Sequence, residues 1–280
     1  MKKVVSMLLA LALALSMIAC GEKEAVTAKV LEYDLTEEQY AFGVDKTQPE
    51  LLTKVNDFVK KIKGDGTLDD IFDKYFSDGE KEGITSAVRD DSKEQLVVAT
   101  NAAFEPFEYT KGDKYYGVDM EIAKLLADEL GMELVIENME FDAVCLAVGQ
   151  QKCDIAMAGL TVNEEREEHV TFSETYYQAS QRLVVPSDDT VFADCKDADA
   201  VLKKLNELKK DTKIGVQKGT TGQFFVEGDA DWGFEALPVT CEAYANGSLA
   251  IQTMLNGNID YVVIDAAPAK YITESINAMQ

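Results

Sequence analysis

From residue 95 onward, short runs rich in β-branched residues alternate with amphipathic helical patterns. Residues 96–100 are typical of a buried strand, and the apolar side chains of residues 122, 125, 126 and 130 recur at helical spacing. Strands that alternate with helices predict parallel sheets covered by helices on both faces. Two such runs, at 95–180 and 186–280, predict an α/β protein with two Rossmann-like lobes.

The same patterns predict the individual elements. We expect further strands at 134–137, 154–158, 213–216, 236–240 and 259–264. We expect helices at 119–130, 142–150, 198–210, from 221, at 248–256 and at 268–276. Asp119 is the expected N-cap of its helix, and Gly131 is the expected C-terminal glycine. Ahead of residue 95 we expect a strand at 40–44 and helices at 48–63 and 68–76. A polar surface linker is expected at 77–93 and an extended connector at 181–186.

The N-terminus has the features of an export signal. Lys2 and Lys3 precede an apolar stretch over residues 4–17, and Ala19 directly precedes Cys20. This pattern resembles a bacterial lipoprotein signal, 1–19, with a lipid on Cys20. The apolar run is short for a membrane span, although an uncleaved anchor helix is the alternative. Both interpretations predict an extracytoplasmic protein, and the first anchors it to the bacterial cell membrane through lipid.

Charge and rare residues exclude several classes of function. The formal net charge of −24 argues against nucleic acid as a partner, while 46% hydrophobic residues suffice for a core. Cys145, Cys153, Cys195 and Cys241 follow Cys20, and the sequence leaves both disulfides and free thiols open. His169 is the only histidine, so we expect neither a metal site nor a histidine-activated nucleophile. No cofactor is expected.

Candidate binding residues follow the ends of the predicted strands, where open α/β sheets bind ligands. Arg166 can bind a carboxylate, with further donors at Thr161, Thr220 and Thr221. Asp265 can bind an ammonium group, and Phe104 and Phe141 can enclose a side chain. Each residue also has a purely structural interpretation: Arg166 as a surface ion pair, Asp265 as an N-cap, and the phenylalanines as core. Their joint position at strand ends favours a site for a small zwitterion.

These residues lie in motifs that resemble the family-3 extracellular solute-binding proteins of ABC importers. The matching runs are Ala99-Thr100-Asn101-Ala102-Ala103-Phe104-Glu105-Pro106-Phe107, Tyr116-Gly117-Val118-Asp119, Gly159-Leu160-Thr161 with Glu165-Arg166, Gly219-Thr220-Thr221 and Asp260-Tyr261-Val262-Val263-Ile264-Asp265. The resemblance implies a periplasmic-binding-protein-like type II fold, whose two lobes are joined by a two-strand hinge and close over a polar amino acid. It implies a permease partner and no catalysis.

The resemblance also assigns roles to residues. Arg166, Thr161 and Thr221 would hold the ligand's α-carboxylate. Asp265 and the segment 158–161 would hold its α-amino group, while Phe104 and Phe141 would stack on its side chain. The expected ligand-binding set is Asn101, Phe104, Phe141, Ala158, Gly159, Thr161, Arg166, Gln217, Thr220, Thr221 and Asp265.

Two departures from the family pattern carry further predictions. Asn101 stands where the family usually has an aspartate that can hold a cationic side chain, which favours a neutral polar amino acid. The segment 40–76 resembles a part that other family members carry at the C-terminal end, so the chain resembles a circular permutant. We therefore expect a tether at 20–27, lobe 1 at 38–181, and lobe 2 at 28–37 plus 182–280. The linker 77–93 follows the permuted helices 48–76, and residues 29–33 should form a strand of lobe 2.

The sequence thus favours a monomeric, membrane-anchored amino-acid receptor of an ABC transporter. The main alternative is a dehydratase-type enzyme on the same fold, in which Glu105, Glu108 or Asp265 would act as acid or base. A sensory module for a separate signalling partner is a third interpretation.

Overall fold

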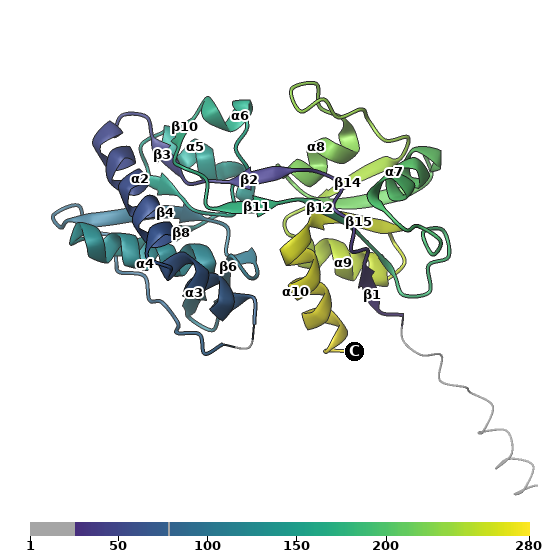
Figure 1. The fold of residues 1–280 in the computed structure, drawn as a ribbon, viewed down its shortest axis with the longest axis horizontal. Coiled ribbons are helices and arrows are strands. Elements are labelled where there is room, and N and C mark those ends of the chain that lie inside the picture. Colours follow the sequence, from purple (N-terminus) through teal and green to yellow (C-terminus); the bar gives the residue numbers. More distant parts are fainter. Residues whose placement is uncertain (1–25, 78) are drawn as a thin grey trace, which may run out of the picture.

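The computed structural model describes residues 26–77 and 79–280, so the predicted signal and Cys20 lie outside the described residues. The chain forms a mixed α/β structure of two lobes, each built on a five-stranded sheet (Figure 1). This arrangement confirms the predicted α/β class. The sheets are mixed rather than purely parallel, because the strands that adjoin the crossings between the lobes pair antiparallel with their neighbours.

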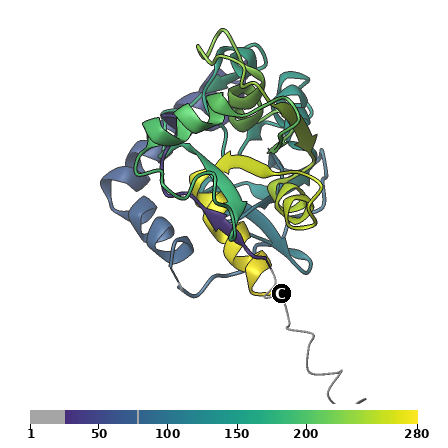
Figure 2. The same ribbon diagram turned by 90° about the vertical axis from the view of Figure 1, so that its right-hand side faces the viewer.

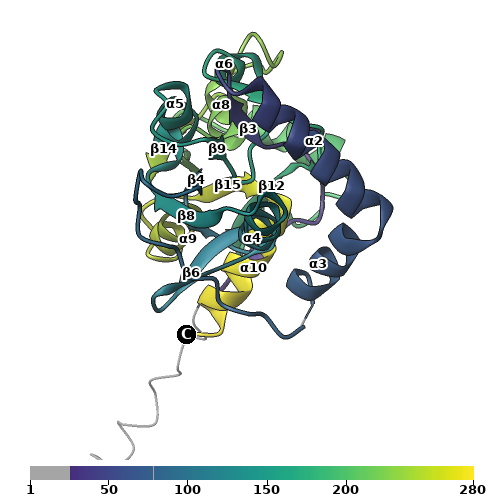
Figure 3. The ribbon, with the colours of Figure 1, turned by 90° about the vertical axis from the view of Figure 1, so that its left-hand side faces the viewer.

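Lobe 1 is built on the sheet β10-β3-β9-β4-β8. Its strands are β3 (Gly43–Asp45), β4 (Gln95–Thr100), β8 (Glu133–Asn138), β9 (Ile155–Ala156) and β10 (Val170–Phe172). The helices α2 (Pro49–Gly64), α3 (Thr67–Tyr75) and α4 (Val118–Leu130) pack on one face, and α5 (Val144–Gly149) on the other (Figure 3). A short ribbon of β5 (Ala103–Phe104), β6 (Glu108–Lys111) and β7 (Lys114–Tyr116) follows β4, while η1 (Phe141–Ala143) and α6 (Glu164–Glu167) are single turns.

Lobe 2 is built on the sheet β1-β12-β15-β13-β14. Its strands are β1 (Ala28–Val30), β12 (Gln181–Pro186), β13 (Lys213–Gln217), β14 (Thr240–Tyr244) and β15 (Tyr261–Asp265). The helices α9 (Gly247–Leu255) and α10 (Ala266–Asn277) cover one face, and α7 (Ala198–Glu207) and α8 (Thr221–Glu227) cover the other. Apolar side chains are buried on both faces of the sheet, and the cluster under α9 and α10 continues into lobe 1.

Two antiparallel strands run between the lobes, β2 (Glu38–Tyr40) and β11 (Tyr177–Ala179) (Figure 1). Tyr177 pairs with Tyr40 and Ala179 pairs with Glu38. The chain leaves β11 directly into β12 of lobe 2, and it enters β2 from β1 of the same lobe. The connector predicted at 181–186 is therefore a strand of lobe 2, and the crossing itself lies just ahead of it.

The first strand of the chain lies in the sheet of lobe 2. β1 pairs antiparallel with β12, with Lys29 opposite Val185. The Asn277 side chain, near the end of α10, accepts a hydrogen bond from the Ala28 N–H at 2.9 Å and donates one to the Ala28 carbonyl at 2.8 Å. The start of the described chain and its C-terminal helix are therefore side by side (Figure 2).

The segment after α3 crosses lobe 1 and is attached to it. Ile84 exchanges backbone hydrogen bonds with Tyr115, and the Ala87 N–H donates to the Leu134 carbonyl at 2.8 Å. The Ser86 hydroxyl accepts from the Ile136 N–H. The linker predicted from composition alone is thus also an extended strip docked against β7 and β8.

Three local predictions were wrong. β14 begins at Thr240 rather than at residue 236, because the N–H groups of Leu237 and Val239 donate to the Val226 and Leu237 carbonyls instead of to a neighbouring strand. The strand predicted at 40–44 is two strands, β2 and β3, which belong to different sheets. α4 begins after Gly117, so Asp119 is a buried helical residue rather than an N-cap. Gly131 ends α4 in the left-handed conformation, as predicted.

The state of the four cysteines, which the sequence left open, is given within residues 26–77 and 79–280. Cys145, Cys153, Cys195 and Cys241 are free thiols. No cluster of potential metal ligands occurs among these residues. None of their helices has the length and apolar character that a membrane crossing requires.

Candidate functional site

Arg166 lies where the two lobes meet. The Asn163 side chain caps α6 by accepting the Arg166 N–H, which holds the residue in place. The guanidinium Nη1 donates to the Thr161 carbonyl at 2.6 Å, and Nη2 donates to the Gly219 carbonyl of lobe 2 at 3.1 Å. Its carbon lies 5.1 Å from the centre of the Phe141 ring. Only 7% of Arg166 is exposed, so the alternative of a surface ion pair is wrong.

Asp265 provides an opposite charge from the other lobe. It ends β15, is 5% exposed, and accepts a hydrogen bond from the Tyr40 hydroxyl at 2.5 Å. Burial, followed by the nearby carboxylate of Glu38, raises the pKa of Asp265 to about 7. Asp265 borders α10 as its N-terminal flanking residue, but its side chain makes no capping hydrogen bond. The N-cap interpretation therefore does not account for this carboxylate.

Glu38 is a site residue that the sequence did not reveal. It is 2% exposed and accepts hydrogen bonds from the Thr161 hydroxyl at 2.8 Å and the Gln181 amide at 3.0 Å. Thr161 in turn presents its carbonyl to Arg166. Arg166 and the Glu38–Asp265 pair thus belong to one connected network. No local pattern could identify Glu38 as a site residue, because Thr161 and Gln181 lie more than a hundred residues away.

A pair of amides joins the lobes beside this network. The Gln217 amide, at the end of β13, donates to the Asn101 side-chain oxygen at 3.1 Å. The Asn101 amide donates to the Met139 carbonyl at 2.6 Å. Gln217 Oε1 is buried and has no hydrogen-bond partner among the described residues. The two predicted residues therefore form a neutral, hydrogen-bonding subsite with one unused acceptor.

Phe104 and the segment 158–161 form the adjoining wall of lobe 1. The Gly159 N–H donates to Asp119 Oδ2 at 2.9 Å, and the Tyr176 hydroxyl donates to Asp119 Oδ1 at 2.6 Å. Gly159 has φ of +54°, and a Cβ there would lie 3.1 Å from the Phe104 ring. Burial raises the pKa of Asp119 to about 7. Phe104, Ala158 and Gly159 thus lie together on a buried wall of lobe 1, and Asp119 holds the Gly159 backbone in place.

The hydroxyl groups of Thr220 and Thr221 differ in their hydrogen bonding. The Thr220 hydroxyl donates to the Gln217 carbonyl at 2.8 Å, so it shapes the turn before α8. The Thr221 hydroxyl is buried and has no partner among the described residues. The Thr161 hydroxyl, which was predicted as a donor to the ligand, donates to Glu38 in this structure. Of the three threonines, Thr221 therefore has the side chain that is available to a ligand.

Further contacts close the lobes around these groups. Lys218 Nζ of lobe 2 lies 2.7 Å from an oxygen of Asp142 in lobe 1, at the exposed margin. Deeper inside, Glu108 is 0% exposed and neither of its carboxyl oxygens has a partner among the described residues. Burial, with Asp119 and Asp265 nearby, raises the pKa of Glu108 well above its ordinary value. The arrangement is a closed interface with a cationic end and an acidic end.

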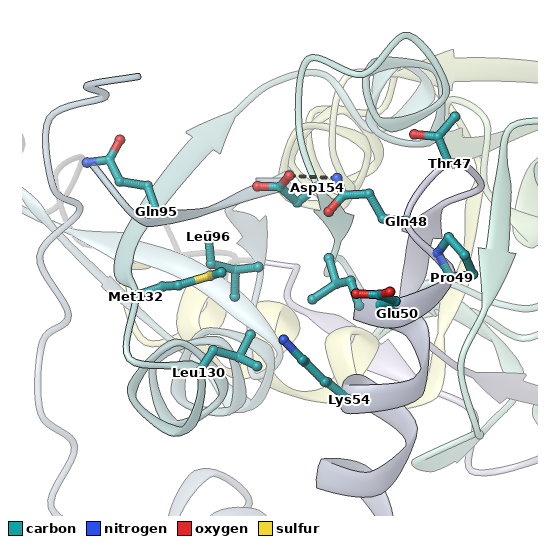
Figure 4. A pocket seen from close by; sticks show the side chains of 11 residues that line it. Thr47, Gln48, Pro49, Glu50, Lys54, Gln95, Leu96, Leu130, Met132 and Asp154 are labelled. Atoms are coloured by element: carbon teal, nitrogen blue, oxygen red, sulfur yellow. Dashed lines mark hydrogen bonds between the residues drawn. The ribbon is translucent and has the colours of Figure 1, made fainter. Parts of the chain in front are cut away.

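Cavities lie at and away from this interface. A cavity of about 130 Å³ reaches Asp265 and Tyr40 from the hinge side, between β11 and the start of α10; Arg166 does not line it. A larger pocket of about 480 Å³ lies on lobe 1 at the amino end of β4, opposite to the end that carries Asn101 (Figure 4). There the Gln48 amide donates to Asp154 at 2.8 Å. Because ligands bind at carboxyl ends of strands in such sheets, the lobe interface remains the candidate site.

Comparisons with known proteins agree with this geometry. Residues 96–221 match the family described as "Bacterial extracellular solute-binding proteins, family 3". The "Arginine-binding extracellular protein ArtP" of Bacillus subtilis is 32% identical over 138 residues, which are 49% of each chain. The chain spans less than two thirds of the length of the curated relatives it matches first.

Solved structures cover a larger share of this chain than that relative does. An ancestral arginine-binding protein bound to arginine is 32% identical, with a TM-score of 0.56 over 66% of this chain and 76% of that one. An ancestral arginine-binding protein bound to glutamine is also 32% identical, with a TM-score of 0.55 over 69% and 77%. The family and these relatives are binding proteins rather than enzymes. Its motifs, its two-lobe fold and these similarities show that the chain belongs to the family-3 bacterial extracellular solute-binding proteins.

Proposed function

We propose that this protein captures a free polar amino acid by closing its two lobes over it, and that it delivers the ligand to an ABC permease. The observation that carries the proposal is the network that joins Arg166 of lobe 1 to Asp265 of lobe 2 through Thr161, Glu38 and Gln181. A zwitterion matches its two ends. Contacts from both lobes favour the closed form, which is how hinge closure couples to binding.

The ligand's α-carboxylate belongs beside Arg166. Among the described residues, its guanidinium is anchored by neutral carbonyls and the Phe141 ring, so a carboxylate would be its counter-charge. The unpartnered Thr221 hydroxyl supplies a further donor. Charge-assisted hydrogen bonds contribute about 1.5–3 kcal/mol each. Three or four of them, less the cost of ordering the ligand, reach the roughly −8 kcal/mol of a micromolar complex.

The ligand's side chain is a neutral polar group in our first proposal. Asn101 and Gln217 offer amide groups and one unused acceptor at the lobe interface. A primary amide on the ligand can donate to Gln217 Oε1 and accept in return. Phe104 and Phe141 enclose the methylene groups that lead to it. This proposal favours glutamine or a ligand of similar shape, as in the glutamine complex of the ancestral relative.

A basic amino acid is the second candidate, favoured by one observation. Glu108 is wholly buried without a hydrogen-bond partner, and an uncompensated buried carboxyl is costly. A cationic side chain that reached it would supply both donors and charge. The relatives named for arginine accord with this candidate. Asn101 thus favours a ligand with a neutral side chain, whereas Glu108 favours one with a cationic side chain.

A thermal-shift screen against the common L-amino acids, followed by calorimetric titration, tests the function. A ligand at 100 times its Kd stabilises the native state by about 2.7 kcal/mol, which raises the melting temperature by several degrees. A complex of unchanged amino acid at one site per chain also separates binding from catalysis. Saturation by neither neutral nor basic amino acids would contradict the proposal.

The chain order is a second part of the proposal: we infer a circular permutation. β1 lies in lobe 2 beside the end of α10, whereas α2 and α3 complete lobe 1. Several solved structures cover 65% or 66% of this chain, close to the share of the chain that follows residue 93. A reordered chain, 94–280 followed by 26–76, is expected to fold and bind the same ligand. An insoluble product that binds nothing would argue against the permutation.

Anchoring completes the proposal. We propose that the chain is cleaved before Cys20 and held at the bacterial membrane by lipid on that cysteine, as a monomer. The support is the sequence pattern Met17-Ile18-Ala19-Cys20. Mass spectrometry of the membrane-extracted protein should find an acylated Cys20 at the new N-terminus. Cys20→Ser should release the protein from membranes, and light scattering should give a monomer mass.

A further inference from the structure

The acidic end of the lobe interface contains two carboxyl groups, although an amino acid offers it one ammonium. Asp265 ends β15, and Glu38 begins β2. In the sheet of lobe 2, Asp265 lies directly opposite Gln181, whose amide donates to Glu38 Oε1 at 3.0 Å. Gln181 therefore links the two carboxyl groups.

Neutral donors provide most of the hydrogen bonds to the carboxyl groups of Glu38 and Asp265. Glu38 accepts from the hydroxyls of Thr36 at 2.6 Å and Thr161 at 2.8 Å, while Asp265 accepts from the Tyr40 hydroxyl. Two ionised carboxylates in a buried environment repel one another, and neutral donors do not remove that repulsion. In the ligand-free closed state, the pair is therefore most stable when it carries a proton.

One acceptor in the cluster has no donor. Gln181 is 0% exposed, and its Oε1 has no hydrogen-bond partner among the described residues. An ammonium group has three N–H donors, one positive charge and no acceptor. Glu38, Asp265 and Gln181 Oε1 are three acceptors that match it. A buried acceptor left unpaired beside two carboxyls is the feature that points to a ligand here.

We propose that Glu38 and Gln181 bind the ligand's α-ammonium together with Asp265, and that the ammonium replaces a proton held by the carboxyl pair. The inference rests on the proposed function and names two binding residues beyond those expected for the family. On binding, a carboxylic acid O–H ionises, its proton passes to solvent, and the ammonium takes its place. The site gains one positive charge from the ammonium and loses one with the proton.

The titratable groups around Glu38 and Asp265 do not supply the proton that is released on binding. Tyr40 of β2 has its pKa raised well above 10 and stays neutral, and the same direction holds for Tyr177 of β11. Glu108 of β6 has its pKa raised by burial. Burial and Glu38 raise the pKa of Asp265 to about 7.

Two charged groups line the hinge-side cavity near Asp265 and compensate each other. Arg182 of β12 lies 2.7 Å from Asp34. Arg182 also forms an ion pair with the exposed Glu32. Their opposite charges are paired at neutral pH, so neither supplies a counter-charge to the acidic end.

Calorimetric titration in two buffers of different ionisation enthalpy tests the exchange, with L-glutamine and L-arginine as probes. We expect close to one proton released per ligand at pH 6 and almost none at pH 8.5. The Kd should rise by up to about tenfold for each pH unit that the pH falls below 7, because protons then compete with the ammonium. Glu38→Gln should weaken binding at least tenfold and remove the proton release. Glu37→Gln, an identical change at the exposed neighbouring residue, should leave both unchanged.

A measurement without ligand separates this inference from the proposed function. In carboxyl-labelled protein, ¹³C NMR should show Asp265 titrating near pH 7, and Glu38→Gln should move that midpoint to lower pH. Two results would overturn the inference while leaving the receptor function intact. One is binding of either probe without proton release at pH 6, and the other is a Glu38→Gln variant that binds as tightly as the original protein. An Asp265 midpoint near 4 in the free protein would overturn it without any ligand or variant.

Discussion

The two ends of the lobe interface handle their charges in opposite ways. At the cationic end, Arg166 is held by two carbonyls and an aromatic ring, one of the carbonyls coming from the opposite lobe. At the acidic end, Glu38 and Asp265 crowd two carboxyls among neutral donors. A guanidinium stays ionised when buried, whereas a carboxyl group can take up a proton. The difference teaches that pH should act on the acidic end alone.

Removal of the cationic end should have the largest effect. Arg166→Ala should weaken amino-acid binding by about 100-fold or more, because loss of one partner of a buried charge pair costs 2–5 kcal/mol. Calorimetric titration measures the loss. Arg89→Ala is a matched control, since Arg89 lies on the surface with a half-exposed ion pair to Asp91. Binding retained by Arg166→Ala would remove the assigned role of this residue.

Removal of one carboxyl group from the acidic end should have a smaller effect. Asp265→Asn should weaken binding by about 10–100-fold, because Glu38 still offers a charge to the ammonium. The same variant should stabilise the ligand-free protein at pH 8, where the two carboxylates repel. Chemical unfolding measures the second effect. Asp260→Asn, at an exposed residue that accepts the Lys213 N–H, is the control, and equal effects of both variants would contradict the comparison.

The ligand-free protein should become more stable as the pH falls from 8 to 5.5. Asp265 and Asp119 have pKa values of about 7 in the folded state, above the ordinary 3.8. The native state therefore binds more protons than the unfolded state in this range, and the free energy of unfolding decreases as pH rises toward 7. Thermal melts should show a difference of several degrees. A flat or rising profile would show that these carboxyls are ionised in the closed form.

The side-chain subsite should respond more modestly. Asn101→Asp should shift the preference toward basic amino acids by about tenfold, near 1.4 kcal/mol, because it adds a carboxylate beside Gln217. Competition between glutamine and arginine measures the ratio in both proteins. Glu108→Gln is the informative partner variant: if the ligand is basic, this change should weaken it, whereas a neutral ligand should bind as before.

The smallest effect should come from the exposed margin. Lys218→Ala removes the ion pair with Asp142, and Lys218 has 65% of its side chain exposed. Exposed pairs contribute about 0–1 kcal/mol, so the Kd should change less than about fivefold, with less change at high salt. A change in Kd as large as that for Arg166→Ala would show that the ligand contacts the exposed margin instead.

Local sequence patterns predicted most of the scaffold because they depend on neighbours within a few residues. Helical spacing located α4, and Gly131 ends it because glycine adopts the left-handed conformation readily. Residues 236–239 were predicted as strand but lie outside the sheet, so β14 was placed too early. Arg166 and Asp265 were predicted as a pair from their motifs and strand ends; both are buried, and their roles in binding stay a prediction.

By itself, the sequence determined the alternation of strands and helices, the family motifs and the two charged residues at the strand ends. Only the tertiary structure decided that Glu38 lies beside Asp265, that Thr161 donates to Glu38, and that Gln181 retains an unpaired oxygen. Helical and strand periodicity is a short-range property of the chain. The burial and repulsion of two carboxyls separated by more than two hundred residues arise when the lobes meet.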